Sequence, residues 1–388
     1  MSIEAKAAVQ LQEVPLSEFE RIATVFGYSF AAPPRHLAGG YASCNFAVSL
    51  VPLDGSSSTP TQAVLKFSNT CIDLADIEHQ LRVLSHLQSS SYKTNYLLPR
   101  RDAAADAPLA ARYLATADGG GPPLAMLVSF VVGTPGDKLL AASPSTEATM
   151  LASLGGALAS LHGIEWPEPP LRHVSCGYPV CNTGELLDPS AAGVAASLDK
   201  LPDHPFVAFL RAPRATRRAI LCARNSRRRR TPSRAGPRLA RFRELFGRAG
   251  LPAGFIHGDG FLDNILCADD GALAALVDWE DSCVAPYVLD VAVAVSAAAF
   301  TASNELLPAR CAALLRGYTA RRPLSADELA ALPDFMWAGA LACGFYRWRE
   351  FNLNRPESAD DAKSAYAIMQ QRCEKMEAAP PDAKAWVS

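Results

Sequence analysis

A histidine, two aspartates and an asparagine lie close together in an otherwise apolar segment of this 388-residue chain, FIHGDGFLDNIL, residues 255–266. Asp259 follows His257 by two positions, and Asn264 follows Asp259 by five. A second segment, LAALVDWED, places Asp278 at the end of an apolar run. Transfer of a phosphoryl group from ATP requires a carboxylate beside the attacking hydroxyl and oxygen ligands for Mg²⁺. These residue types therefore indicate phosphoryl-transfer chemistry.

The spacing assigns a role to each of these residues. Protein kinases carry a His-x-Asp sequence, a metal-binding Asn five positions after that Asp, and a second Asp on a following turn. Asp259 is therefore predicted to orient the acceptor hydroxyl and accept its proton, while Asn264 and Asp278 hold Mg²⁺. His257 is expected to be structural. The alternative is a polar hairpin whose acids only cap turns, as Asp and Asn often do.

A hairpin is needed to bring these side chains together. The sequence ADDGAL, residues 268–273, has the composition of a turn between two short apolar strands. Strands on either side of this turn would place Asp259, Asn264 and Asp278 at one end of the hairpin. We expect the three side chains to surround a metal-bound phosphate there.

The first part of the chain is predicted to form a small antiparallel sheet. Residues 36–55 are typical of a strand, a small-residue turn and a second strand, and TQAVLKFS, residues 61–68, is typical of a third. Apolar residues recur at helical spacing in residues 75–88. Two apolar runs around a Gly-Gly-Gly-Pro-Pro turn in residues 108–133 predict a hairpin that closes the same sheet.

The rest of the chain is predicted to be mainly helical, beginning with an Ala/Leu-rich helix in residues 145–164. The fold class is therefore expected to be α+β, with a small antiparallel sheet lobe and a larger helical lobe. We assign residues 1–132 to an N-terminal nucleotide-binding lobe. Residues 133–388 would form the C-terminal lobe, which carries the catalytic and substrate-binding groups.

The charge of the chain gives no global attraction to nucleic acid or to an anionic membrane, since the formal net charge is -2. One local exception is the stretch from Arg211 to Arg243, which holds thirteen arginines and no acid. We interpret this stretch as a solvated insertion. Binding of nucleic acid is the alternative, but the stretch lacks the interleaved aromatic residues of such sites.

The composition is that of a folded soluble protein, with 49% hydrophobic and 20% charged residues. The sequence shows no apolar run of the length that a membrane-spanning helix needs, and no targeting pattern at its N-terminus. Its ten cysteines lack the spacing of a disulfide framework, which favours reduced thiols. We therefore expect a cytoplasmic enzyme that has no membrane partner.

Taken together, HGDGFLDNIL, VDWED and VLDVAVAV resemble the aminoglycoside-phosphotransferase-like kinases, in particular their homoserine kinase branch. The resemblance covers most of the chain. It implies a protein-kinase-like fold, ATP and Mg²⁺ as cofactors, and a small hydroxylated, amine-bearing acceptor bound by the helical lobe. Asp290 in VLDVAV matches the helix aspartate that supports the catalytic loop in this family, with an ordinary helix-start acid as the alternative.

The resemblance also assigns nucleotide-binding residues in the sheet lobe. Lys66 in AVLKFS matches the third-strand lysine that meets the phosphates, and Glu78 matches its acidic helix partner. Such a partner is physically sensible because burying an unpaired lysine is costly, whereas the alternative is an edge-strand lysine that reaches solvent. The backbone of Ser129, Phe130 and Val131 would contact the adenine edge. The loop over the phosphates would contain four small or polar residues, Gly39, Gly40, Ser43 and Asn45.

Two residues depart from the family pattern. Gly260 follows the predicted catalytic aspartate where a larger apolar residue is usual, and Trp279 replaces a smaller aromatic after the predicted metal ligand. Both changes affect the shape of the acceptor pocket more than its charge. Glu280 and Asp281 come next, and one of them is predicted to face the amino group of the acceptor. The alternative is that both are solvated.

These inferences describe a kinase that transfers the γ-phosphate of ATP to a hydroxyl of a small amino acid or amino alcohol, with homoserine as the leading acceptor. Hydroxylysine, choline, ethanolamine and aminoglycosides are the alternative acceptors. The rival hypothesis from a different class is a catalytically silent, kinase-like protein that binds nucleotide, or binds a partner through its arginine-rich stretch. The sequence specifies neither the acceptor nor the oligomeric state.

Overall fold

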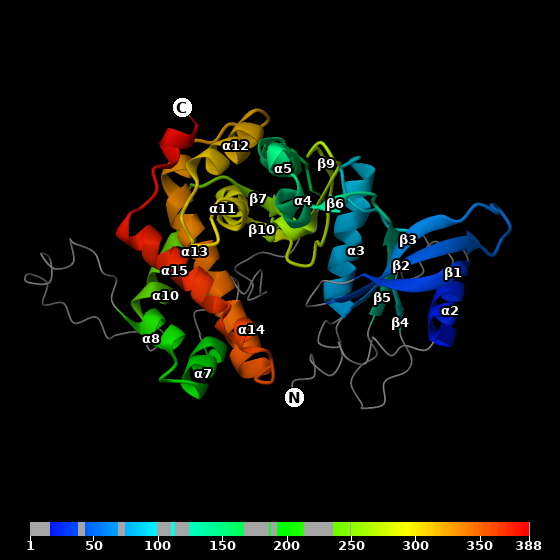
Figure 1. Ribbon diagram of the computed structural model, residues 1–388, viewed down its shortest axis with the longest axis horizontal. Coiled ribbons are helices and arrows are strands. Elements are labelled where there is room, and N and C mark those ends of the chain that lie inside the picture. Colours follow the sequence, from blue (N-terminus) through cyan, green and yellow to red (C-terminus); the bar gives the residue numbers. More distant parts are fainter. Residues whose placement is uncertain are drawn as a thin grey trace, which may run out of the picture. The chain divides into compact units, whose positions relative to one another are not determined.

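Figure 1 shows the computed structural model of the chain. The structure describes residues 16–37, 43–68, 74–98, 110–112, 124–166, 186–187, 192–212, 236–248 and 250–387. It divides into two compact units. The first contains Met1–Gly133 and Ala274–Glu280, and the second contains Thr134–Leu273 and Asp281–Ser388. Strand β9 (Leu273–Leu276) carries the chain from the second unit into the first.

An antiparallel sheet of five strands, in the order β1-β2-β3-β5-β4, forms the centre of the first unit (Figure 1). The pairing of β4 with β5 is the hairpin that the sequence predicts for residues 108–133. Its elements are α2 (Leu16–Val25), β1 (Tyr28–Leu37), β2 (Ser43–Pro52), β3 (Thr61–Ser68), α3 (Leu74–Ser89), β4 (Ala110–Arg112) and β5 (Leu124–Ser129).

Strand periodicity decides which face of this sheet is buried. Successive side chains of a strand point to opposite faces, so Leu65 and Phe67 of β3 enter the same apolar core. Helix α2 packs on that core, with the Phe19 ring 4.7 Å from the ring of Phe46 and 5.5 Å from that of Phe67, both edge to face. Lys66 lies between two core residues in sequence and therefore extends from the opposite face.

The second unit is mainly helical. Its helices are α4 (Gly136–Ala142), α5 (Glu147–Leu161), α7 (Ala192–Lys200), α8 (Pro205–Arg211), α10 (Pro237–Phe246), α11 (Tyr287–Ala298), α12 (Pro308–Thr319), α13 (Ala326–Arg349), α14 (Asp360–Ser364) and α15 (Tyr366–Ala378). Single turns of 3₁₀-helix are η1 (Pro144–Thr146), η4 (Leu262–Asn264) and η6 (Ala383–Trp386), and η5 (Glu350–Asn354) is π-helical.

Two small sheets accompany the helices. Strand β7 (Ala253–Ile256) pairs with β10 (Cys283–Pro286), while β6 (Thr134–Pro135), β8 (Ile265–Cys267) and β9 form a second sheet in the order β6-β8-β9. These strands carry the segment in which the sequence places the catalytic residues. A small antiparallel sheet and a larger helical part confirm the predicted α+β fold class.

Glycines permit the closest helix contact in the second unit. Helices α5 and α12 approach so closely that a Cβ atom on Gly155 would overlap the carbonyl oxygen of Leu314. In the same way, a Cβ atom on Gly317 would overlap the carbonyl oxygen of Ala152. Two chain segments that are far apart in sequence are thus held in a fixed register. This contact matters for the site because α5 ends beside His162 and α12 carries Tyr318.

Helix α13 is the longest helix in the described part of the chain. Ser325 begins it with a capping box, in which the Ser325 side chain accepts from the Glu328 N–H and the Glu328 carboxylate accepts from the Ser325 N–H. The stretch Ala326–Asn354 is long and apolar enough to cross a membrane, but 61% of its apolar window is buried inside the protein. A buried core helix accounts for that composition.

Candidate active site

Lys66 forms the centre of a charged cluster in the first unit. Its Nζ atom lies 2.7 Å from Asp278 Oδ1 and 3.4 Å from Glu280 Oε2, and its side chain is 13% exposed. Burial alone lowers the pKa of Lys66, but the charges of Asp278 and Glu280 outweigh burial and raise the pKa above its ordinary value. Lys66 is therefore a permanent cation at neutral pH.

The acidic partner that the family pattern assigns to Lys66 lies elsewhere. Glu78 is exposed on α3, whereas its neighbours Ile77 and His79 are buried. The helical period turns Glu78 toward solvent because the adjacent positions pack into the unit. The predicted Lys66–Glu78 pair is thus not formed in this structure, and the two carboxylates that follow β9 take its place.

Asp278 has an unusual backbone conformation. Its φ angle is +69°, in the left-handed region that non-glycine residues rarely adopt and that costs about 1–2 kcal/mol. Contacts on either side hold it there. The Leu276 N–H donates to the Lys93 carbonyl at 3.0 Å, and the buried Trp279 donates its indole N–H to Thr94 Oγ1 at 2.8 Å. Trp279, which departs from the family pattern, therefore anchors the turn that aims the Asp278 carboxylate.

In the second unit, the segment after β7 brings Asp259 and Asn264 together. The Asn264 side chain donates through Nδ2 to the Asp259 carboxylate at 2.7 Å and to the Asp259 carbonyl at 3.0 Å. The buried His257 accepts the Asp259 N–H at Nδ1, at 3.2 Å. The spacing of five residues thus closes a compact loop through η4. The predicted turn follows, with Gly271 at φ +86° between β8 and β9.

Asp290, at the start of α11, is fully buried and holds this loop by its backbone. One carboxylate oxygen accepts the N–H of His257 and the other accepts the N–H of Gly258, both at 3.0 Å. Gly258 has a φ angle of +83°, which a residue without Cβ adopts at no steric cost. The carboxylate also lies 3.0 Å from Nε2 of His162. Asp290 therefore fixes the backbone immediately before Asp259.

The protonation states of Asp290 and His162 follow from these contacts. Burial raises the pKa of Asp290, but hydrogen bonding and charge from His162 and His257 outweigh it, and the pKa falls below its usual value. Burial lowers the pKa of His162, which outweighs its hydrogen bond with Asp290. At neutral pH Asp290 is therefore ionised and His162 is neutral. An ionised carboxylate only accepts, so His162 donates through Nε2 and accepts at Nδ1.

A buried hydrogen-bond chain continues from His162 to the beginning of α13. The Tyr318 hydroxyl donates to His162 Nδ1 at 2.7 Å, and the Tyr318 oxygen accepts from Arg322 at 3.0 Å. Arg322 is paired with the buried Glu328 at 2.9 Å. The sequence patterns missed His162, Tyr318 and Arg322. The only local signal is a lone His at the end of a helix, while its partners lie more than a hundred residues away.

The remaining nucleotide-binding predictions fall on the first unit. Gly39 and Gly40 lie outside the described residues, and Ser43 begins β2, directly opposite Ser68. Asn45 is the β2 residue paired with Lys66 across the sheet.

Strand β5 ends at Ser129, the first of the three residues that are predicted to contact adenine. Ser129 exchanges hydrogen bonds with Tyr96, and the Phe130 N–H donates to the Gln62 carbonyl at 3.2 Å. Val131 is the third, and it follows directly. The backbone predicted to contact adenine is thus held by β3 and by the segment around Tyr96 up to Phe130.

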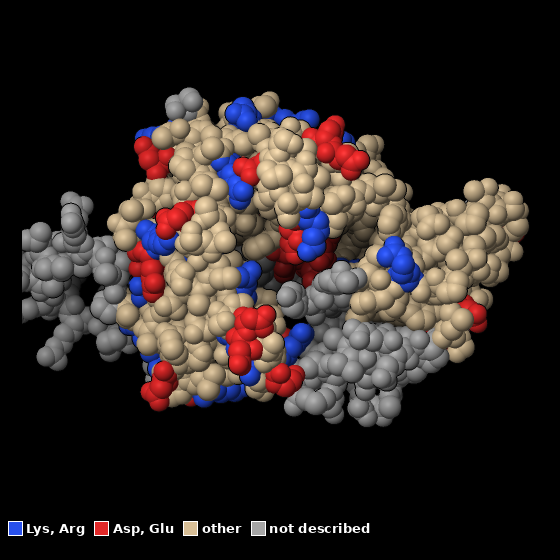
Figure 2. Space-filling model, in the orientation of Figure 1, with Lys and Arg blue, Asp and Glu red and all other residues tan. Residues whose placement is uncertain are grey.

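Charged side chains are interspersed on the face drawn in Figure 2, where acidic and basic groups alternate over the helices of the second unit. No extended patch of one sign is visible on that face. Within the described residues, no group of three or more His, Cys, Asp or Glu side chains could hold a metal ion by itself.

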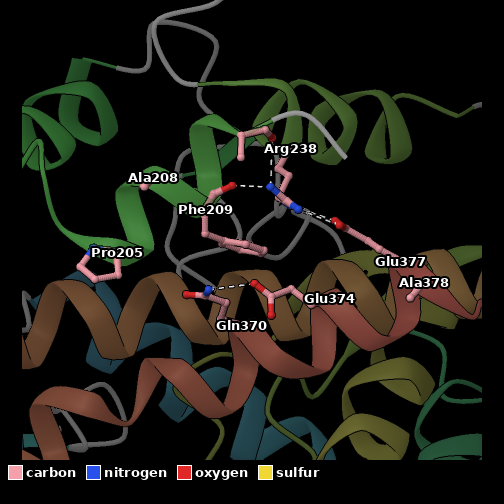
Figure 3. Close-up of a pocket in the computed structure, with 9 residues that line it drawn as sticks. Pro205, Ala208, Phe209, Arg238, Gln370, Glu374, Glu377 and Ala378 are labelled. Atoms are coloured by element: carbon pink, nitrogen blue, oxygen red, sulfur yellow. Dashed lines mark hydrogen bonds and ion pairs between the residues drawn. The ribbon is translucent and has the colours of Figure 1, made fainter. Parts of the chain in front are cut away.

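The second unit contains a cavity between α8, α10 and α15 (Figure 3). Its main polar feature is Arg238, which is paired with Glu377 at 2.7 Å and stacked on Phe209 at 4.0 Å. Arg238 also donates to the Phe209 and Ala212 carbonyls. The cavity contains none of the predicted site residues, and its buried ion pair ties α10 to α15.

This fold and these motifs are those of a phosphotransferase. The model of the phosphotransferase enzyme family matches residues 37–324, and the chain belongs to that family. The curated relatives include the homoserine kinase of Neisseria meningitidis serogroup B, 38% identical over 103 residues, which are 26% of this chain and 33% of the relative. The homoserine kinase of Caulobacter sp. strain K31 is 40% identical over 84 residues, 22% of this chain and 26% of the relative.

The matched segments thus span about a third or less of the length of these relatives. Solved structures cover the chain more fully. A microcompartment-associated aminopropanol kinase is similar over 93% of this chain and 97% of its own, with a TM-score of 0.61 and 20% identity. A choline/ethanolamine kinase family protein from Mesorhizobium loti covers 99% of this chain and 98% of its own, with a TM-score of 0.53 and 14% identity. These likenesses confirm the protein-kinase-like fold predicted from the sequence.

Proposed function

We propose that this protein is an ATP- and Mg²⁺-dependent kinase that phosphorylates a hydroxyl group of a small amino acid or amino alcohol, with homoserine as the leading acceptor. The observation that carries the proposal is the Asp259–Asn264 contact at 2.7 Å in a loop whose backbone is held by buried Asp290. Such a loop keeps a carboxylate at a fixed position for an incoming hydroxyl.

Asp259 would orient the acceptor hydroxyl and take its proton during transfer. Because the Asn264 Nδ2 atom is bound to Asp259, its Oδ1 atom is the one available as a metal ligand. The oxygen ligands of Asn264 and Asp278 fit Mg²⁺ in kind. Bound Mg²⁺ would neutralise charge on the transferring phosphoryl group. Lys66, a cation at neutral pH, would contact the nucleotide phosphates.

The nucleotide would be held mainly by backbone groups. We assign the adenine edge to Ser129, Phe130 and Val131, where β3 and the segment around Tyr96 hold the backbone up to Phe130. Glu78, exposed on α3, would pair with Lys66 only after a rearrangement of that helix. The loop over the phosphates would include Gly39, Gly40, Ser43 and Asn45.

Two comparisons support the choice of acceptor. The partly matching homoserine kinases favour an amino acid, and the aminopropanol kinase likeness favours a small amino alcohol on the same fold. We assign the acceptor's amino group to Glu280 or Asp281. The Glu280 carboxylate lies 3.4 Å from Lys66, so Glu280 would have to serve both charges.

A direct assay tests the proposal. The purified protein is incubated with Mg-ATP and homoserine, hydroxylysine, choline, ethanolamine, aminopropanol or an aminoglycoside, and ADP release is followed together with the phosphorylated product. We expect product with homoserine or aminopropanol. Absence of product with every acceptor would refute the proposal.

The variant Asp259→Asn tests the assigned base. We expect kcat to fall by about 10²- to 10⁴-fold, the usual contribution of a general base, with nucleotide affinity largely unchanged. Asp263→Asn is a matched control, since Asp263 is an exposed acid of the same segment. Near-normal turnover by Asp259→Asn would contradict the assignment.

A further inference from the structure

One face of helix α13 lies against the segment that carries Asp259. Gly339 and Cys343, one turn apart on α13, line a small cavity together with Phe261, which is two residues after Asp259. Residues four positions apart on a helix share a face. Arg347 is therefore the next residue on the α13 face that contacts the catalytic segment.

The charges around Cys343 show what lies near this face. Partial burial raises the pKa of the Cys343 thiol, and the charges of Arg347, Asp259 and Arg372 all act on it. Arg347 donates through Nη1 to the Ala365 carbonyl at 3.5 Å, a long contact. A half-buried guanidinium group and the predicted catalytic carboxylate are thus neighbours of one side chain.

A second arginine lies behind this position. Arg372 of α15 is 9% exposed and donates to the Ser296 carbonyl at 2.6 Å and to Asn304 at 3.0 Å. Its guanidinium group lies 4.6 Å from the centre of the Phe300 ring. Burial, followed by the charge of Arg347, lowers the pKa of Arg372 to about 10. The charge of Arg347 thus acts unfavourably on the charged form of Arg372.

No ion pair is formed by either of these arginines among the described residues, whereas several other largely buried arginines of the second unit are paired with acids. These pairs are Arg238–Glu377, Arg310–Glu147, Arg322–Glu328 and Arg355–Glu350. Two like charges that form no ion pair with an acid favour the binding of an anion.

We propose that Arg347, supported by Arg372, binds the carboxylate of an amino-acid acceptor whose hydroxyl group is presented to Asp259. The inference rests on the proposed kinase function and makes it more specific, because only an amino acid has a carboxylate for this site. Guanidinium and carboxylate groups form two parallel hydrogen bonds, which fixes orientation as well as charge. An amino alcohol would leave the two arginines unpaired.

The experiment uses two acceptors that differ only in the carboxylate, homoserine and 3-amino-1-propanol. For the full-length protein and Arg347→Met, which keeps an apolar stem of similar length, kcat/KM is measured for each acceptor at saturating Mg-ATP. We expect the variant to lose about 10- to 100-fold with homoserine, mainly through KM, because a charge-assisted contact is lost. Values for 3-amino-1-propanol and the KM for ATP should stay unchanged.

Two further variants separate binding from folding. Arg347→Lys keeps the charge but not the paired geometry and should recover part of the homoserine activity. Arg316→Met removes an exposed arginine of α12 and should change neither acceptor.

The possible results separate the proposed carboxylate site from the proposed kinase function. Three results with Arg347→Met would overturn the carboxylate site and leave the kinase proposal standing. They are unchanged activity with homoserine, an equal loss with both acceptors, and a rise in the KM for ATP in place of the KM for homoserine. Failure of the unaltered protein to phosphorylate either acceptor would overturn the homoserine proposal and the inference together.

Discussion

Asp278 and Asp290 are two aspartates of similar sequence setting, each beside a buried apolar run, yet the structure treats them differently. Asp278 is 30% exposed, shares one lysine with Glu280, and lies on a strained backbone. Asp290 is fully buried and accepts from two backbone N–H groups and from His162. An acid that must exchange partners during a reaction needs access, whereas an acid that holds a loop needs a complete set of donors.

The comparison predicts that Asp290 contributes mainly to stability. In Asp290→Asn an amide NH₂ group replaces one carboxylate oxygen. This group faces a hydrogen-bond donor, so a buried N–H loses its acceptor. We expect the free energy of unfolding to fall by about 3 kcal/mol or more, as for other broken buried pairs. Denaturant unfolding of the purified variant measures this.

Asp334→Asn is the matched control for that experiment. Asp334 also has two partners, Arg241 and Arg248, but its side chain is 30% exposed. Exposed pairs contribute about 1 kcal/mol or less. If both variants lose the same stability, the distinction between a buried clamp and a surface pair is wrong for this protein.

Asp278 should show the opposite pattern. In Asp278→Asn we expect Mg²⁺-dependent kcat/KM to fall by about 100-fold or more, since the proposed metal ligand loses its charge, while the free energy of unfolding changes by about 1 kcal/mol or less. Kinetics at several Mg²⁺ concentrations and unfolding curves check the two parts separately. Asp269→Asn, in the exposed turn between β8 and β9, is the control for a general effect of charge. Full activity in Asp278→Asn would remove Asp278 from the site.

The sequence predicts contacts that depend on short spacing better than contacts that depend on packing. Asn264 follows Asp259 by five positions, and this short spacing was enough to expect the two side chains to lie close together. Lys66 was also correctly expected to need acidic partners. The identity of those partners was not predictable, because the helical phase of α3 turns Glu78 to solvent and the turn after β9 supplies Asp278 and Glu280.

The chain from His162 to Glu328 is a stronger case of the same limit. Its members come from α5, α12 and the start of α13, and no short pattern in the sequence links them. They meet because Gly155 and Gly317 allow α5 and α12 to touch, so the contact depends on two glycines that carry no chemical signal. Arg347 was not predicted for a related reason. Its proposed role depends on the face of α13 on which it lies, and the sequence does not show what that face contacts.

The smallest predicted effect concerns the pH dependence of stability that His162 adds. His162 belongs to the Asp290 clamp, by which we mean Asp290 with its hydrogen-bond partners His162, His257 and Gly258. Burial lowers the pKa of His162 in the folded protein. As the pH falls below the pKa of about 6.5 that His162 has in the unfolded chain, the unfolded chain therefore binds more protons than the folded protein does. The contribution of His162 is therefore complete above that pH and is lost as the pH falls toward the folded pKa. The slope from one such group is at most about 1.4 kcal/mol per pH unit.

His162→Gln tests this contribution, because glutamine keeps a neutral donor for Asp290 and an acceptor for Tyr318 but does not titrate. We expect the variant to lose about 1 kcal/mol at pH 7.5 and to show a shallower fall of the unfolding free energy between pH 7 and pH 5.5. His204→Gln is the control, since the pKa of His204 is also lowered by burial but His204 lies outside the clamp. If the pH dependence of the unfolding free energy becomes shallower in His204→Gln and not in His162→Gln, the titrating group is not His162. The stability of the clamp would then come from Asp290 and the loop backbone alone.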